Sequence, residues 1–258
     1  MAKPVFIHIL SDAGSDPLET TAAQAMVYRF LPEAKLIYSA RRFSSGDVVS
    51  SGILLRLLHN RFPTPTIHFC YTRIKSRDPG RYTAAFTDTG VFFAPDFGIL
   101  PLALEGLQVR YYGLDYLPQG ADALQDLYLP AAMQVLDNNY QPLPHWTEKP
   151  AVSSPLVSPT TGDGHYRLTV VYCDDQGNAY LNMDKNTFET ITAGKKWYIR
   201  PAFKVAIERI STTYRDEDDG AALALFGAGD LLQIAICDGS ARRYLGLDVA
   251  KMVLLEVL

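Results

Sequence analysis

The sequence has few cysteines and no long apolar run. No stretch approaches the roughly 18 consecutive apolar residues of a membrane-spanning helix, and the first apolar segment, Val5–Leu10, is too short for the core of a secretory signal. Cys70, Cys173 and Cys237 lie far apart, each within or at the end of an apolar run. This pattern favours buried free thiols over disulfides or structural zinc. We therefore expect a cytoplasmic protein with no membrane segment.

The sequence also has little excess charge. Its 258 residues include 24 Lys and Arg against 28 Asp and Glu, giving a formal net charge of −4. Phosphate binding needs a basic face, so we do not expect nucleic acid to be the main partner, although a local basic patch stays open. Hydrophobic residues make up 48% and charged residues 20%, a composition typical of a folded globular protein. At roughly 100–200 residues per domain, the length allows one large domain or two modest ones.

Several catalytic signatures are missing from the sequence. It has no P-loop, no G-x-G-x-x-G after a strand, no H-E-x-x-H and no G-x-S-x-G. The five histidines show no metal-ligand spacing, and His8 and His68 fall inside predicted strands, where a packed histidine is the simpler interpretation. The acidic run 216–219 lacks the alternating ligands of a calcium loop and predicts a solvated turn. We therefore expect no metal site.

The first half of the chain alternates strand and helix patterns. Apolar runs predict strands over residues 5–10, 35–39, 66–72, 82–86 and 91–94. Helical patterns and start signals predict helices beginning at Pro17, near Ser44 and near Ala123. For the first of these helices, Asp16 is the expected N-cap and Phe30 the approximate end. Interleaved strands and helices predict an α/β domain over residues 1–140, a layered sheet with flanking helices.

The pattern changes after residue 140. Residues 141–164 hold five prolines among Ser, Thr and Gly, which predicts an extended linker. Beyond it, residues 165–258 contain many short apolar runs separated by turn signals. The predicted strands cover residues 166–173, 179–183, 197–201, 205–210, 221–226, 231–236 and 252–257. This spacing is typical of a smaller all-β domain resembling a barrel.

Two acidic turns are candidate ligand sites. Asp12 directly follows the first predicted strand, and ligands of open α/β sheets bind outside the carboxyl ends of the strands. A carboxylate there can accept hydrogen bonds from both hydroxyls of a ribose, or it can simply shape the turn. The segment Asp174–Asn178, read alone, is a hairpin turn whose Gly and Asn tolerate positive φ.

The order of short motifs along the chain resembles the family of S-adenosylmethionine hydroxide adenosyltransferases, whose relatives include fluorinating and chlorinating enzymes. The family patterns are L-[ST]-D-x-G-x-x-D-P, F-P-x-G-T-V-H, A-P-D-N-G-L-L, D-x-F-G-N and L-x-E-I-A. The segments similar to them, in the same order, are Leu10–Pro17, Arg61–His68, Phe93–Leu100, Asp174–Asn178 and Leu231–Ala235. The resemblance therefore extends over nearly the whole chain.

The resemblance implies an α/β N-terminal domain, a β C-terminal domain and a homotrimer. It also implies that the ligand lies between the N-terminal domain of one subunit and the C-terminal domain of its neighbour. S-adenosylmethionine would be a substrate or ligand, with no separate cofactor. By similarity, Asp12 would bind the ribose hydroxyls and Asp174 the amino group of the methionine part. Asn178 would bind the adenine, and Tyr180 would stack on the ligand.

The sequence departs from the family where hydrolysis takes place. Hydrolysing relatives use an Asp, an Arg and a His to activate water for attack on the ribose C5′. Arg73 stands at the position of that Asp and Ala123 at the position of that His. Arg81, or Arg77, could replace the Arg, and Asp78 is the nearest other polar group. We take Asp78 and Arg81 as the candidate catalytic residues and Arg73 as a candidate ligand contact.

Three functions stay open on these residues. The chain could hydrolyse S-adenosylmethionine to adenosine and methionine with a rearranged set of groups. It could instead be a catalytically silent nucleoside-binding or assembly protein, since the family's Asp and His are replaced. Arg73 and Lys75 would repel a sulfonium and suit an anionic nucleoside, unless Arg73 pairs with Asp78 or Asp126. Leu124 stands where halogenating relatives have Ser, which disfavours halide chemistry.

Overall fold

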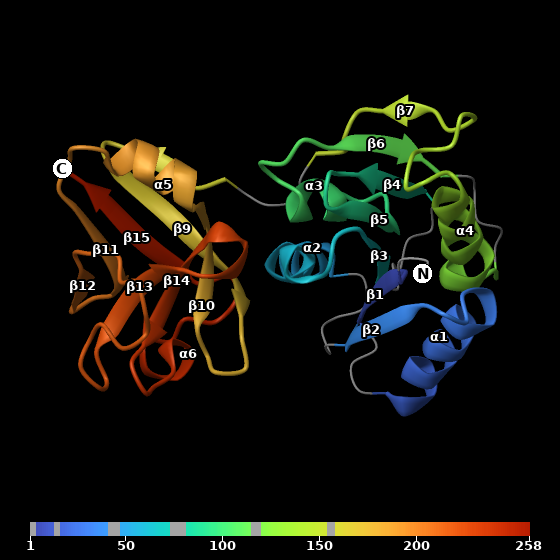
Figure 1. Ribbon diagram of the computed structural model, residues 1–258. Coiled ribbons are helices and arrows are strands. Elements are labelled where there is room, and N and C mark those ends of the chain that lie inside the picture. The colour runs from blue at the N-terminus through green and yellow to red at the C-terminus, as the bar shows by residue number, and fades with distance from the viewer. Residues whose placement is uncertain (1–3, 13–15, 41–46, 73–80, 115–119, 154–157) are drawn as a thin grey trace. The chain divides into compact units, whose positions relative to one another are not determined.

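The computed structural model divides the chain into two compact units, Met1–Pro155 and Leu156–Leu258 (Figure 1). The boundary between them falls inside the predicted linker. The structure describes residues 4–12, 16–40, 47–72, 81–114, 120–153 and 158–258.

The first unit contains a mixed seven-stranded sheet in the order β2-β1-β3-β5-β4-β6-β7. Its strands are β1 (Phe6–Ser11), β2 (Lys35–Ala40), β3 (Thr66–Tyr71), β4 (Tyr82–Phe86), β5 (Gly90–Pro95), β6 (Arg110–Gly113) and β7 (Glu148–Lys149). β2, β1, β3 and β5 are parallel neighbours, whereas β4, β6 and β7 pair antiparallel. All five predicted strands are present, and β4 and β5 form the predicted hairpin.

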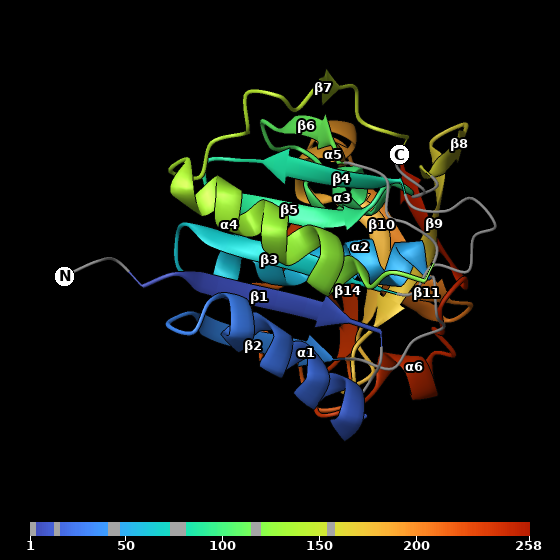
Figure 2. The ribbon, with the colours of Figure 1, turned by 90° about the vertical axis from the view of Figure 1, so that its right-hand side faces the viewer.

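Helices cover both faces of this sheet. They are α1 (Pro17–Phe30), α2 (Val48–Leu58), the 3-10 turn η1 (His59–Arg61), α3 (Ile99–Ala103), the π-helical turn η2 (Leu124–Tyr128) and α4 (Leu129–Asp137). Figure 2 shows α1 and α4 side by side across one face. Their apolar side chains pack with alternate strand residues such as Ile7, Ile9 and Phe69. α2 and α3 pack together on the opposite face (Figure 1).

Side-chain caps explain where two of these helices begin. The N–H of Leu18 donates to Asp16 Oδ1 at 2.9 Å, so Asp16 caps α1 as predicted. Asp47 caps α2 by accepting the N–H of Ser50 at 2.9 Å and its hydroxyl at 2.6 Å. The predicted start of this helix near Ser44 lies outside the described residues.

The second unit contains an antiparallel eight-stranded sheet in the order β12-β11-β15-β9-β10-β14-β13, with β8 paired to β9. Its strands are β8 (Thr160–Gly162), β9 (His165–Cys173), β10 (Ala179–Asp184), β11 (Trp197–Ala202), β12 (Val205–Ile207), β13 (Ala222–Phe226), β14 (Leu231–Ile236) and β15 (Met252–Val257). A bridge between Ile210 and Ala224 brings the two ends of the sheet together, so the barrel is nearly closed. Every predicted strand is present.

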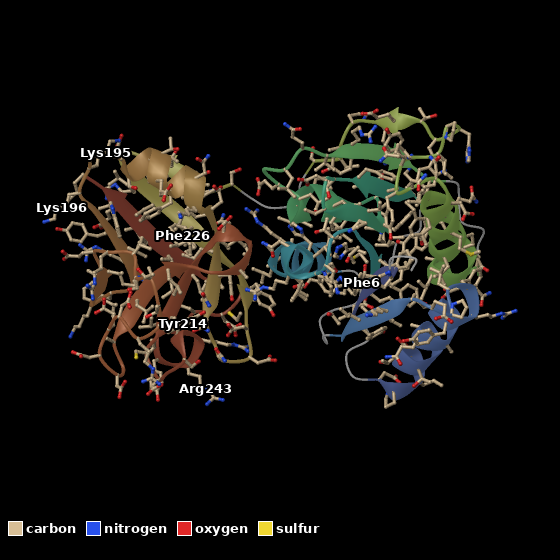
Figure 3. The ribbon with its side chains drawn as sticks, viewed as in Figure 1. Phe6, Lys195, Lys196, Tyr214, Phe226 and Arg243 are labelled. Atoms are coloured by element: carbon tan, nitrogen blue, oxygen red, sulfur yellow. The ribbon has the colours of Figure 1, made fainter. Side chains whose placement is uncertain are left out.

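Three short helical segments complete the second unit, namely α5 (Lys185–Thr192), the 3-10 turn η3 (Ala228–Asp230) and α6 (Ala241–Tyr244). The sequence patterns did not predict α5. Its Phe188 packs 5.1 Å from the ring of Trp197 and 5.5 Å from the ring of Phe226, measured between centroids. Phe226 is labelled on the second unit in Figure 3. This apolar contact anchors α5 to the barrel core.

Parts of the predicted linker belong to the two sheets. β7 (Glu148–Lys149) pairs with β6, and β8 (Thr160–Gly162) pairs with β9. Neither short strand contains any of the prolines of this segment, which cannot donate a hydrogen bond to a sheet ladder. The three cysteines are free and buried, as expected. Among the helices that the structure describes, none is long and apolar enough to cross a membrane.

Candidate functional site

Asp12 lies directly after β1 and is 7% exposed. It borders a cavity of about 240 Å³ at the carboxyl ends of β1 and β3. The cavity is lined by Ser11, Asp12, Glu19, Ala22, Ala23, Met26 and Tyr71. Ser11 and Tyr71 are register partners on the two strands, and Glu19 comes from the first turn of α1. Asp12 therefore lies at the carboxyl end of the first strand, the edge at which open α/β sheets bind ligands.

Tyr71 is bonded to Asp122, which lies just before η2. The Tyr71 hydroxyl donates to Asp122 Oδ2 at 2.5 Å, and Asp122 Oδ1 accepts the N–H of Gln125 at 2.9 Å. Burial raises the pKa of Tyr71 well above its usual range, and the hydrogen bond to Asp122 and the charge of Glu19 add to this shift. The phenol therefore stays protonated and keeps donating to Asp122 at neutral pH.

The cavity has an acidic lining. In the described part of the chain, two carboxylates, Asp12 and Glu19, border it and no lysine or arginine does. Such a lining favours a neutral polyhydroxyl or cationic ligand group over a phosphate. Arg73 and Lys75, which the sequence suggested could attract an anionic nucleoside, lie outside the described residues.

The second candidate turn connects β9 and β10. Asn178 donates its N–H to Asp174 Oδ1 and its side-chain Nδ2 to Asp174 Oδ2, both at 2.9 Å. Gly177 has φ +86°, and a Cβ there would lie 2.0 Å from Ser240 Oγ. The predicted hairpin turn is therefore present, with the positive φ at Gly177. In this conformation Asp174 and Asn178 bind each other.

Tyr180 lies on β10 and is buried, with its ring centroid 5.5 Å from that of Tyr172. Its register partner on β14 is Gln233, a fully buried amide. Gln233 Oε1 accepts the hydroxyl of Tyr214 at 2.9 Å, whereas its Nε2 has no hydrogen-bond partner among the described residues. Gln233 occupies the Glu position of the family's L-x-E-I-A pattern, and it is not among the site residues predicted from the sequence.

The two strand histidines pack against each other, away from the cavity. His8 Nδ1 lies 3.0 Å from His68 Nδ1, and the rings stack on Phe62 and Phe92 with centroids 4.2 and 4.4 Å apart. Burial lowers the pKa of His8 to about 3 and holds that of His68 well below its usual range. Both are packed histidines, as predicted. No cluster of three or more His, Cys, Asp or Glu side chains suited to a metal occurs among the described residues.

Of the remaining predicted site residues, Arg73 and Asp78 lie outside the described residues. Arg81 is exposed just before β4, and its backbone carbonyl accepts the N–H of Asp96 at 2.9 Å. Ala123 is half-buried between Asp122 and η2. The methyl group of Ala123 cannot transfer a proton.

The comparison with protein families covers both units. The model of the SAM hydroxide adenosyltransferase N-terminal domain matches residues 7–142, and that of the C-terminal domain matches residues 168–254. The chain belongs to the SAM hydroxide adenosyltransferase family. In this SAM hydroxide adenosyltransferase family member, the Asp12 cavity lies in the N-terminal family domain and the Asp174–Asn178 turn in the C-terminal one.

Solved structures show the same fold. An uncharacterized conserved protein from Thermotoga maritima has a TM-score of 0.78 at 18% identity, over 96% of this chain and 99% of that one. A conserved hypothetical protein from Thermus thermophilus has a TM-score of 0.69 at 21% identity, over 100% of both chains. No curated protein matches this member of the SAM hydroxide adenosyltransferase family.

Proposed function

We propose that this family member binds an adenosyl ligand and that Asp12 accepts hydrogen bonds from its ribose hydroxyls. One observation carries this proposal: Asp12 borders a cavity at the carboxyl end of β1, where open α/β sheets bind ligands. The acidic lining suits a diol, and it also suits the sulfonium of S-adenosylmethionine better than a phosphate.

In the proposed homotrimer, the C-terminal domain of a neighbouring subunit would supply the other ligand contacts. In this proposal Asp174 binds the amino group of the methionine part, Asn178 binds the adenine, and Tyr180 stacks on the ligand. Asp174 accepts two hydrogen bonds from Asn178, whereas a carboxylate has about four acceptor positions. It therefore keeps the capacity to accept an ammonium. We propose a homotrimer as the assembly, to be tested by light scattering of the purified chain.

Transfer of the adenosyl group to water is the proposed reaction. The water oxygen would bond to C5′, the C5′–S bond would break, and methionine would leave with the electron pair on sulfur. The water proton would pass to a protein group or to solvent, and Asp78 and Arg81 are the proposed catalytic residues, with Arg73 a proposed ligand contact. Ala123 supports a second function, a catalytically silent nucleoside-binding or assembly protein, because it replaces a proton-transfer residue.

Calorimetric titration with S-adenosylmethionine, adenosine and adenosine monophosphate tests the proposal. Asp12→Asn should weaken adenosine binding at least about tenfold, since hydrogen bonds to a charged group contribute about 1.5–3 kcal/mol. Asp88→Asn is the matched control, because Asp88 is exposed in the β4–β5 hairpin. If no ligand binds at millimolar concentration, or if both variants weaken adenosine equally, the Asp12 site is wrong.

Product analysis separates the two functions. Chromatography of an S-adenosylmethionine incubation should show adenosine and methionine in equal amounts if the chain is a hydrolase, and this release should be lost in Asp12→Asn. Binding without release would support the silent protein. Preferential binding of adenosine monophosphate would contradict the acidic-cavity argument and favour an anionic nucleoside as ligand.

A further inference from the structure

Tyr71 lines the cavity, and its hydroxyl donates a hydrogen bond to Asp122. The Tyr71 phenol donates its single proton to Asp122 Oδ2 at 2.5 Å. The other oxygen of Asp122 is held by the N–H of Gln125 at the start of η2. The direction of the Tyr71–Asp122 hydrogen bond is therefore fixed by the fold.

A phenol oxygen that has donated its proton can only accept from other groups. Tyr71 borders the cavity beside Asp12 and Glu19, and Glu19 is near enough for its charge to add to the raised pKa of the phenol. Tyr71 therefore differs from the two carboxylates of the same lining, because its oxygen is a neutral acceptor. A ligand group that contacts this oxygen or either carboxylate must bring a donor to that contact.

We propose that Tyr71 is a specificity-determining residue whose oxygen accepts a hydrogen bond from one sugar hydroxyl of the bound nucleoside. Asp122 is the positioning residue, because it accepts the hydrogen bond of the Tyr71 hydroxyl and so leaves the phenol oxygen as an acceptor. The inference rests on the proposed nucleoside site and assigns to that site a preference that Asp12 alone does not give. The wall selects an intact ribose diol over sugars in which the contacted hydroxyl is absent or replaced by a pure acceptor.

A purely structural bond between Tyr71 and Asp122 is the competing explanation, because the bond also ties the start of η2 to β3. The two explanations differ in their ligand dependence. A structural role would make Tyr71→Phe weaken every nucleoside by a similar factor. An acceptor role would weaken only ligands that carry the contacted hydroxyl.

The first test measures affinities of wild type and Tyr71→Phe for adenosine, 2′-deoxyadenosine and 3′-deoxyadenosine by calorimetry. Tyr71→Phe should weaken adenosine about five- to tenfold, the effect of one lost neutral hydrogen bond. It should leave unchanged the affinity for the one deoxy analogue that already lacks the contacted hydroxyl. Tyr112→Phe is the matched control, because Tyr112 also donates to a carboxylate, Glu148, but does not border this cavity.

The second test reverses the polarity of the pair with Asp122→Asn. The Gln125 N–H requires an acceptor, so the new amide should keep its oxygen at the helix start and direct its NH₂ toward Tyr71. The Tyr71 hydroxyl would then be free to donate into the cavity. We expect the preference for adenosine over its 2′-O-methyl and 3′-O-methyl analogues to fall at least about threefold, because the phenol could now donate to an ether oxygen.

The outcomes are distinguishable. If the wild-type chain binds no nucleoside, the proposed function fails and this inference fails with it. If wild type binds adenosine but Tyr71→Phe weakens all three nucleosides equally, or none of them, only the role of Tyr71 is overturned. If Asp122→Asn leaves the methyl-ether discrimination intact in a variant that unfolds like wild type, the positioning role of Asp122 is overturned.

Discussion

The buried His8–His68 pair makes the first unit sensitive to mild acid. In the unfolded chain a histidine has a pKa near 6.5, whereas burial lowers the pKa of His8 to about 3 in the folded protein. Because the folded pKa is the lower one, the unfolded state binds a proton between pH 6.5 and 3 that the folded state does not. The contribution of neutral, buried His8 to the unfolding free energy is therefore fully present above pH 6.5 and is lost as the pH falls through this window.

The size of the effect follows from linkage. Each such histidine removes about 1 kcal/mol of unfolding free energy per pH unit below 6.5. His68 has its pKa lowered in the same direction by burial and by His8 and His59, so both histidines act in this window. Between pH 6.5 and 5.0 the pair should cost roughly 3 kcal/mol, a large part of the stability of a typical domain. His59, whose pKa burial and Arg56 lower, adds to the slope in the same direction.

Urea unfolding at several pH values between 7.5 and 5.0 measures this slope. The chain has two tryptophans, so Trp197→Phe leaves Trp146, which packs near Phe86 and Tyr112, as the fluorescent reporter of the first unit. In that background His8→Asn should reduce the dependence of the unfolding free energy on pH by about 1 kcal/mol per unit. His165→Gln is the control, because His165 is exposed. Equal slopes in the His8 and His165 variants would refute the reasoning.

Two predictions concern local structure. Gly177→Ala should destabilise the second unit by more than Gly194→Ala. Both glycines have positive φ, a conformation that costs an alanine about 1–2 kcal/mol, but only at Gly177 would the new Cβ meet Ser240. Urea unfolding followed by Trp197 fluorescence checks this, and equal losses would contradict the contact. Asp47→Ala should cost the first unit about 1 kcal/mol through its lost helix cap, whereas Asp47→Asn should retain the cap to the Ser50 N–H. Equal unfolding midpoints for the two Asp47 variants would contradict capping.

Local signals explain why the strands and long helices could be predicted from sequence. The Asp16-Pro17 start of α1 is encoded by adjacent residues, and the cap is formed by those residues. α5 could not be predicted in this way. Its sequence, with three threonines in 185–192, has low helix propensity. It is stabilised by the Asp184 cap and by the burial of Phe188, which depends on strands distant in sequence.

The candidate site was predictable only in part. Asp12 could be found because a carboxylate directly after a strand has a defined place in an α/β sheet. The Tyr71–Asp122 bond joins residues 51 positions apart, and only the packing of η2 against β3 brings them together. Gln233 is similar, since its contact with Tyr214 spans 19 positions. Comparison with family motifs singles out positions, but contacts between them come from the folded chain.

The π turn over Leu124–Tyr128 directly precedes α4 and lies between the polar residue Asp122 and the apolar part of the helix. A π turn has i→i+5 hydrogen bonds and therefore holds about one residue more than an α turn. Leu124 and Tyr128 of this turn pack in the same core as Leu129, Ala132 and Val135 of α4. Asp122, just before the turn, contributes no apolar side chain to that core and instead accepts the hydroxyl of Tyr71. The polar contact to the cavity wall and the apolar packing of the helix thus depend on different residues, so one can change without removing the other.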